Sequence, residues 1–262
     1  MAVIEEPTRE LAAAPARVVT PEESLGVFRR PVRTSGWRSW LFTVDHKRIG
    51  IMYGVAAITF FVVGGVEALA IRSQLFQPNG KVLSADLYNQ MFTMHATSMI
   101  FLFAMPMAAA LGNYLVPLQI GARDVAFPRL NLFSFWCFVT GALFVNCAWI
   151  LGGAADGGWF MYAPNSSVAF SPTHGIDFWS IGLLITGIAS VTGAINLIVT
   201  VLNMRAPGIT IMRVPTLSWM TLVTQSIMLF AMPVITVALV LLVLHRNVGA
   251  TFFDVGAGAD PL

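Results

Sequence analysis

A single histidine, His95, lies inside the apolar run MFTMHATSMIFLF, residues 91–103. Hydrocarbon offers an imidazole neither a hydrogen bond nor a metal, so burial there without a partner is costly. Ionisable side chains in membrane spans usually face the bundle interior and mark cofactor sites, ion routes or proton relays. Position alone leaves two interpretations open for His95: a neutral imidazole bonded to a neighbouring helix, or a ligand of a metal or haem iron.

A second set of residues that could do chemistry is polar and shares one depth on three predicted helices and a loop. The set contains an acid, three asparagines and a serine: Asp124, Asn113, Asn131, Ser134 and Asn196. Each is expensive in lipid unless it faces protein or water, so the shared depth predicts a hydrated crevice. The alternative is local, because Asn131 is a good helix N-cap and Asp124 could pair with Arg123 or Arg129.

Composition predicts that membrane-spanning helices position these residues. Hydrophobic residues make up 56% of the 262-residue chain and charged residues only 11%, whereas a soluble domain carries roughly a quarter charged residues. A helix needs about 20 apolar residues to cross a bilayer. Five windows satisfy this, which predicts an all-α polytopic transmembrane helix bundle with spans near 49–71, 91–116, 132–151, 177–203 and 217–244.

Residues 1–48 differ from the rest, because they are polar, contain proline and show no apolar period. We predict a flexible tail that is not a secretory signal, since it lacks an apolar core before a cleavage site. Twelve Lys and Arg residues fall on the side of the N-terminus and three on the other side. Cationic segments stay in the cytoplasm, so the N-terminus is predicted to be cytoplasmic.

Several blocks occur in a fixed order along the chain and carry a family resemblance. They include FTVDHKRIGIMY (42–53), MFTMHATSMIF (91–101), GNYLVPLQIGARDVAFPRLNLFSFW (112–136), GAINLIVTVLNMRAPGIT (193–210) and RNVGATFFD (246–254). From about residue 37 onward the sequence resembles subunit I of the haem–copper oxidases, in the A-type branch that contains cytochrome c oxidase. The resemblance implies that residues 49–262 are the first five of that family's twelve spans.

The resemblance implies cofactor-binding roles for four residues. His95 aligns with an axial ligand of the low-spin haem iron, and Arg72 with an arginine that contacts the haem formyl group. Trp159 and Tyr88 resemble aromatic residues near the haem propionates. Their alternatives are an anchor that snorkels to the interface, for Arg72, and ordinary interfacial aromatics, for Trp159 and Tyr88.

The same resemblance implies a proton route. The polar set aligns with the mouth and lower part of the D-pathway, a proton-uptake channel. Asp124 would collect protons at the entrance, and Asn113, Asn131, Ser134 and Asn196 would hold a chain of water.

The oxygen-reducing site of the family lies outside what this chain can build. That site needs further histidines on a high-spin haem and on copper, and this chain has four histidines, of which only His95 lies within a predicted span. High-spin haem and copper are therefore expected only in a full-length subunit. We expect the chain to be an N-terminal fragment or truncated product that is inactive alone.

The electron donor is inferred from four positions. Quinol oxidases of the same branch carry an arginine, an aspartate, a histidine and a glutamine that bind quinone, and the aligned residues here are Val63, Glu67, Leu87 and Gln90. Only the glutamine is kept and Glu67 is a conservative acid, which favours cytochrome c.

The resemblance also implies oxidase subunits II and III and the lipid bilayer as partners, no nucleic acid, and a bacterial plasma membrane location. The alternatives are a quinol oxidase subunit I and a non-enzymatic five-span transporter or scaffold.

Overall fold

The computed structural model describes residues 36–259, and within that range the chain is helical with no strand. Most of the predicted tail, residues 1–35, lies outside the described residues. The rest of it contains a short helix, α1 (Arg38–Leu41), and the start of α2 at His46. The boundary predicted at residue 48 therefore falls inside the first long helix.

Five helical segments are long and apolar enough to cross a membrane, which confirms the predicted polytopic bundle. They are α2 (His46–Gln74), a continuous second span, α5 (Pro128–Cys147), α6 (Gly175–Asn203) and α7 (Thr216–Asn247). The second span consists of α3 (Ala85–Thr97), a π-helix η2 (Ser98–Ala104) and α4 (Met105–Gln119). Two single 3₁₀ turns, η3 (Ile211–Arg213) and η4 (Val255–Ala257), complete the order.

Local sequence sets the helix ends. The Asp45 carboxylate accepts a hydrogen bond from the Lys47 amide at 2.8 Å and caps α2, and Ser84 caps α3 in the same way. The third span ends at Cys147 rather than at 151 as predicted, because a turn follows in which Gly152 and Gly153 have positive φ.

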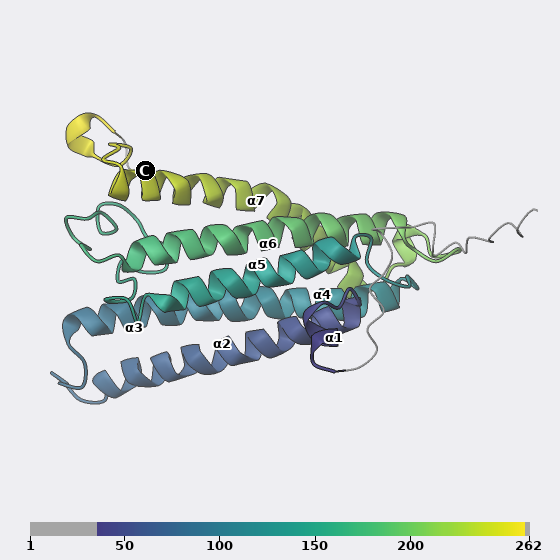
Figure 1. The fold of residues 1–262 in the computed structure, drawn as a ribbon, viewed down its shortest axis with the longest axis horizontal. Coiled ribbons are helices and arrows are strands. Elements are labelled where there is room, and N and C mark those ends of the chain that lie inside the picture. The colour runs from purple at the N-terminus through teal and green to yellow at the C-terminus, as the bar shows by residue number, and fades with distance from the viewer. Residues whose placement is uncertain (1–35, 260–262) are drawn as a thin grey trace, which may run out of the picture.

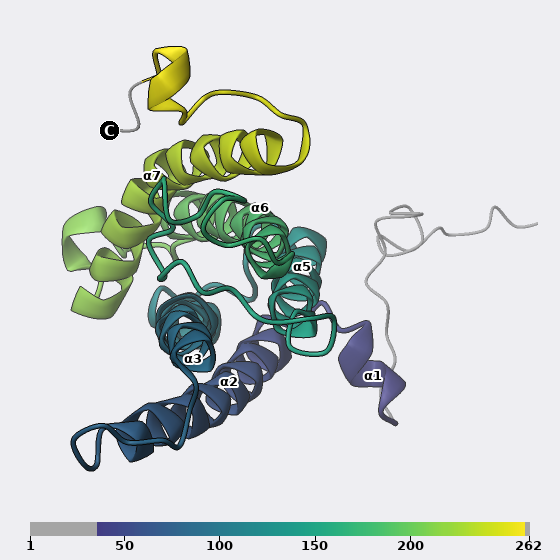
Figure 2. The same cartoon turned by 90° about the vertical axis from the view of Figure 1, so that its left-hand side faces the viewer.

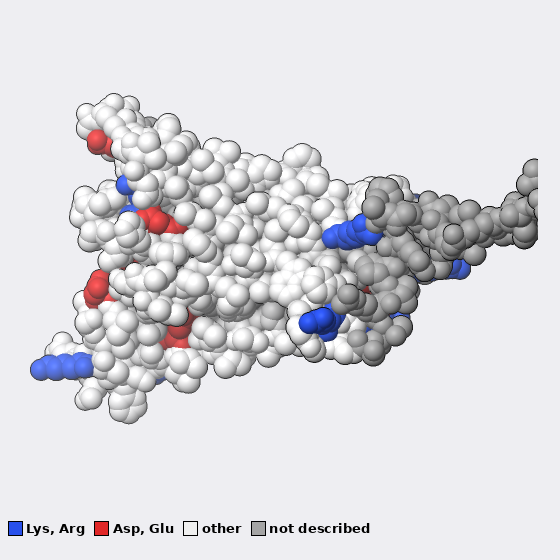
Figure 3. Space-filling view, in the orientation of Figure 1, with Lys and Arg blue, Asp and Glu red and all other residues white. Residues whose placement is uncertain are grey.

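Successive spans run in opposite directions along one bundle axis (Figure 1). We call one end the basic end, where α2, α5 and α7 begin, and the other the opposite end. Figure 2 looks along the bundle from the opposite end and shows α2 and α7 on opposite sides, with α5 and α6 between them. In the space-filling view, charged residues gather toward the two ends and the middle of the visible face is white (Figure 3). This distribution is what a membrane-spanning bundle requires.

The spans approach closely where small residues meet. A Cβ added to Gly141 of α5 would lie 2.6 Å from the carbonyl oxygen of Gly182 on α6, and 2.7 Å from Thr186 Cγ2. Glycine at such a crossing lets two backbones touch, which is how membrane helices gain packing energy without a hydrophobic driving force. The α5–α6 pair is therefore the centre of the bundle.

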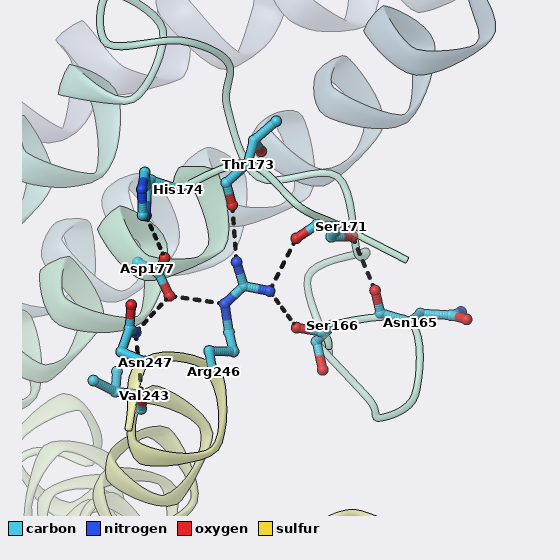
Figure 4. A network of polar contacts seen from close by, with 9 residues as sticks. All are labelled: Asn165, Ser166, Ser171, Thr173, His174, Asp177, Val243, Arg246 and Asn247. Carbon is cyan, nitrogen blue, oxygen red and sulfur yellow. Dashed lines mark hydrogen bonds and ion pairs between the residues drawn. The ribbon is translucent and has the colours of Figure 1, made fainter. Parts of the chain in front are cut away.

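At the opposite end, a buried ion pair ties α6, α7 and the 148–174 loop together (Figure 4). Arg246 Nε donates to Asp177 Oδ1 at 2.7 Å, and their side chains are 1% and 12% exposed. The two terminal nitrogens of the guanidinium, Nη1 and Nη2, donate to the carbonyl oxygens of Ser166, Ser171 and Thr173 at 2.6–3.1 Å. We call Arg246 and Asp177 the loop clamp. All three guanidinium nitrogens of Arg246 donate to an oxygen, so the burial of its charge is compensated.

Replacing Asp177 by Asn should destabilise the protein by about 3–5 kcal/mol, because the Arg246 charge would stay buried without its counter-ion. Thermal unfolding of the protein in detergent measures this. His174→Ala is the matched control, since His174 bonds the same carboxylate at 2.9 Å but its side chain is 78% exposed. Equal stability of Asp177→Asn and His174→Ala would show that the ion pair does not hold the loop.

Candidate functional site

His95 is held against α2 by a single hydrogen bond. Its Nδ1 lies 2.8 Å from the carbonyl oxygen of Gly64, and no described residue bonds Nε2. Gly64 permits the approach, since a Cβ there would lie 3.2 Å from Ser98 Cβ. A carbonyl acceptor fixes the proton on Nδ1 and leaves the Nε2 lone pair available, which is the arrangement found in metal-ligating histidines. The residue therefore fits axial ligation of haem iron. Among residues 36–259 no cluster of three or more His, Cys, Asp or Glu could hold a free metal ion.

The other three cofactor candidates are not all brought to His95. Tyr88 is seven residues before His95, two helical turns away on the same face of α3. Arg72 is exposed and lies eight residues beyond Gly64 on α2, about 12 Å further toward the opposite end. Trp159 differs, because its neighbour Gly158 donates its amide to Thr93 at 2.9 Å. Thr93 is about 200° around α3 from His95, so Trp159 adjoins the other face of the span.

Trp159 instead lines a cavity of about 400 Å³ at the opposite end. Its ring centroid is 6.4 Å from that of Phe101 in η2. The cavity also touches Trp179 and Leu239, from α6 and α7. Its walls are mostly apolar and aromatic. The structure thus separates the cofactor candidates into a His95 side and a Trp159 side of the same span.

A π-helix, η2, divides the second span into two α-helical halves. His95 lies in α3 before it, and Asn113 lies in α4 after it. The wider π-turn changes the rotational phase between the two halves, so their side chains need not share one helical face. Such segments are frequent at functional sites and are seldom visible in a sequence.

The three asparagines are all buried near the basic end, with exposures of 3% or less. Each has one side-chain amide atom without a hydrogen-bond partner. Asn113 donates to Ala109 but its Oδ1 has no partner, and Asn196 accepts from the Phe127 amide at 2.8 Å but its Nδ2 has none. The Nδ2 of Asn131 is also without a partner. Buried amide atoms of this kind are normally hydrated, so the site suits bound water.

Ser134 extends the polar set toward the middle of the bundle. Its hydroxyl donates to the carbonyl of Ala189 at 2.8 Å and lies 2.8 Å from the hydroxyl of Tyr53. Tyr53, Ser134 and Asn113 line a cavity of about 320 Å³ that also reaches Thr186 and Ser190. That volume holds several water molecules. The walls of the cavity are otherwise mostly apolar, so water in it would bind at these polar side chains.

Asp124 lies in the loop between α4 and α5 and is only 6% exposed. One of its oxygens accepts the Val125 amide at 2.8 Å. The same loop is fastened to α6 by Thr200, which accepts from the Ala126 amide at 2.9 Å. The loop that carries Asp124 is thus joined to α6 at the basic end, through Thr200 and Asn196.

The sequence did not predict the positions of two further residues, Tyr53 near the basic end and Gln90 toward the opposite end. Tyr53 reads in the sequence as one aromatic residue among many on an apolar helix, and only the fold places its hydroxyl beside Ser134. Gln90 was considered only as a position aligned with quinone binding. Its Oε1 accepts from the Ala154 amide at 3.1 Å, so it holds the loop that carries Trp159.

Comparisons with known proteins identify relatives of this chain. Residues 48–262 match the family described as "Cytochrome C and Quinol oxidase polypeptide I". The chain is 51% identical over 223 residues to "Cytochrome c oxidase subunit 1" of Bacillus sp. (strain PS3), covering 85% of this chain and 36% of that protein. It is 47% identical over 226 residues to "Quinol oxidase subunit 1" of Bacillus spizizenii, covering 86% of this chain and 35% of that protein.

The matched relatives are thus both cytochrome c and quinol oxidases, and the chain spans about a third of their length. The family match covers well over half of the chain. Together with the five-span helical bundle, these matches assign the chain: it belongs to the family of cytochrome c and quinol oxidase subunit I.

Proposed function

We propose that this chain is part of the catalytic subunit of a respiratory terminal oxidase and that His95 is an axial ligand of its low-spin haem. The observation that carries the proposal is the imidazole inside a span, with Nδ1 bonded to Gly64 and Nε2 without a described partner. The haem would supply one-electron transfer. His95 would hold it and keep the ligating nitrogen unprotonated, because the Gly64 carbonyl retains the proton on Nδ1. Arg72 lies on α2 and Tyr88 on α3, and both would contact the edge of the haem.

The activity of such a subunit is the reduction of oxygen to water, coupled to proton uptake and pumping. High-spin haem and copper belong to the full-length subunit. Subunits II and III and the lipid bilayer are the proposed partners, in a bacterial plasma membrane. The N-terminus and the basic end would face the cytoplasm, because cationic segments stay on that side.

Cytochrome c is the proposed electron donor. A quinol site would need polar groups that a lipid-dissolved quinol can reach. Gln90 is 8% exposed and its amide is used within the protein, between Asp86 and Ala154. The observation that favours the quinol alternative is the carboxyl group of Glu67, because both of its oxygens are buried without a hydrogen-bond partner. However, Glu67 is only 5% exposed and faces protein.

We propose that the polar set at the basic end takes up protons. Asp124 would receive a proton from the cytoplasmic side, and water bonded to Asn131, Asn113 and Asn196 would pass it to Ser134. The amide atoms without a partner support this role, because each offers water one free donor or acceptor. Asparagine cannot itself titrate, so these residues orient the chain of water rather than trap the proton.

Replacing His95 by Ala should abolish the optical bands of the low-spin haem in the assembled oxidase, because the variant has no side-chain nitrogen to bind iron. Reduced-minus-oxidised difference spectra measure this. His174→Ala is the control, since that exposed imidazole precedes α6 at the opposite end and does not lie within a span. Unchanged low-spin bands in His95→Ala would overturn the proposed ligand.

Replacing Asp124 by Asn should lower steady-state oxygen consumption roughly tenfold or more, because an amide cannot deliver a proton to the route. Haem content and low-spin bands should stay at the wild-type level, since Asp124 follows α4 at the basic end whereas His95 lies in α3, in the other half of the second span. Oxygen-electrode measurements with excess reduced cytochrome c test this. Asp254→Asn, an exposed acid at the opposite end, is the matched control, and equal rates in both variants would contradict the proton route.

A further inference from the structure

One face of α3 carries a row of buried polar side chains, which we call the polar stripe: Gln90, Thr93 and Thr97. Their spacing of three and four residues puts them on a single helix face. Both threonines have no exposed surface, and Gln90 is 8% exposed. Buried polar groups in a span require partners, and each of these three side chains accepts a hydrogen bond from outside the helix.

Each stripe residue accepts a hydrogen bond from a different part of the chain. Two donors are amides of the 148–174 loop: Ala154 to Gln90 Oε1 at 3.1 Å, and Gly158 to Thr93 Oγ1 at 2.9 Å. The third is the indole Nε1 of Trp179 on α6, which donates to Thr97 Oγ1 at 2.8 Å. The stripe therefore joins α3 to both the loop and α6.

The two hydroxyl groups have their own protons committed. Thr97 Oγ1 donates to the carbonyl of Thr93 at 2.8 Å, and Thr93 Oγ1 donates to the carbonyl of Asn89 at 2.8 Å. With their protons directed along the helix, the oxygens present lone pairs outward to the incoming donors. The direction of each cross-bond is thereby fixed, which makes the contact specific rather than adaptable.

His95 lies between the two threonines in sequence and points the other way. It is two residues from each of them, about 200° around the helix. The stripe bonds therefore hold one side of α3, while the bond from His95 Nδ1 to Gly64 holds the other. Rotation of α3 about its axis would break bonds on both sides at once.

We propose that the polar stripe is a positioning device for His95: it sets the rotation and depth of α3 and so aims Nε2 at the iron. This inference rests on the proposed function, because it assumes that His95 is a ligand. Thr97 is its decisive member, since its bond from Trp179 is the stripe bond that connects α3 to α6, another spanning helix. Neither residue is proposed to touch the haem.

The first test is Thr97→Val in the full-length assembled oxidase. The valine keeps the shape of threonine but removes the acceptor of the Trp179 bond. We expect the low-spin haem band to shift or broaden while the haem content per protein stays the same. Thr192→Val is the matched control, because the Thr192 hydroxyl bonds only to carbonyls of its own helix, at 2.8 and 3.0 Å. It should leave the band unchanged.

A double-mutant cycle separates positioning from general damage. Trp179→Phe should shift the band in the same direction as Thr97→Val, and the double variant should show no additional shift, because both changes remove one bond. Thr97→Ser, which retains the hydroxyl, should restore the wild-type band. Hydrogen exchange at the Gly158 amide should stay slow in Thr97→Val, since its Thr93 acceptor is untouched.

The outcomes are distinguishable from failure of the proposed function. If His95→Ala loses the low-spin band but Thr97→Val and Trp179→Phe both keep the wild-type band, the positioning role is overturned and the ligand assignment stands. If His95→Ala keeps the band, the proposed function itself fails. Should Thr97→Val not assemble, Trp179→Phe and Thr97→Ser decide, and an additive or opposite shift in the cycle would also overturn the inference.

Discussion

The hydrogen bond from His95 Nδ1 to the carbonyl of Gly64 is the contact on which the rest of this structure depends. The bond offsets the free-energy cost of burying an imidazole in a span and uses only one ring nitrogen. The lone pair on Nε2 is therefore left for the proposed iron. Glycine on α2 favours this close approach, because a Cβ at position 64 would lie 3.2 Å from Ser98 Cβ, which would have to shift by a few tenths of an ångström. The bond also requires α3 to face α2 with the correct rotation. The stripe on the far side of α3 meets that requirement.

Three sets of buried polar groups in this bundle differ in how fully their hydrogen bonds are made. The loop clamp and the polar stripe are satisfied within the protein, with donors and acceptors matched between elements. The asparagines at the basic end are not, and each leaves one amide atom free. A fully bonded network stabilises one arrangement, whereas a half-bonded one can bind and orient water. The loop clamp and the polar stripe lie toward the opposite end, and the asparagines lie at the basic end.

The second span links these two ends. His95 and the stripe occupy its first half, the π-helix its middle, and Asn113 its last half. A regular α-helix of the same length would fix the rotation of one half from that of the other. The wider π-turns relax this constraint, which lets each half satisfy its own neighbours. The proposed electron and proton routes can thus share one helix.

Apolar windows of about 20 residues determined the five spans from the sequence alone, because the bilayer imposes their length and composition. Ordered motifs in the sequence likewise pointed to the family and to His95. Helix ends were missed by a few residues, since glycines in a turn rather than hydropathy ended α5. Which faces meet was decided only by tertiary packing. Trp159 lies across α3 from His95, and the Tyr53 hydroxyl lies beside Ser134. These placements depend on how each helix is rotated about its axis and on the π-turn in the second span. The sequence alone shows neither the rotation nor the π-turn, because both are set by packing between helices.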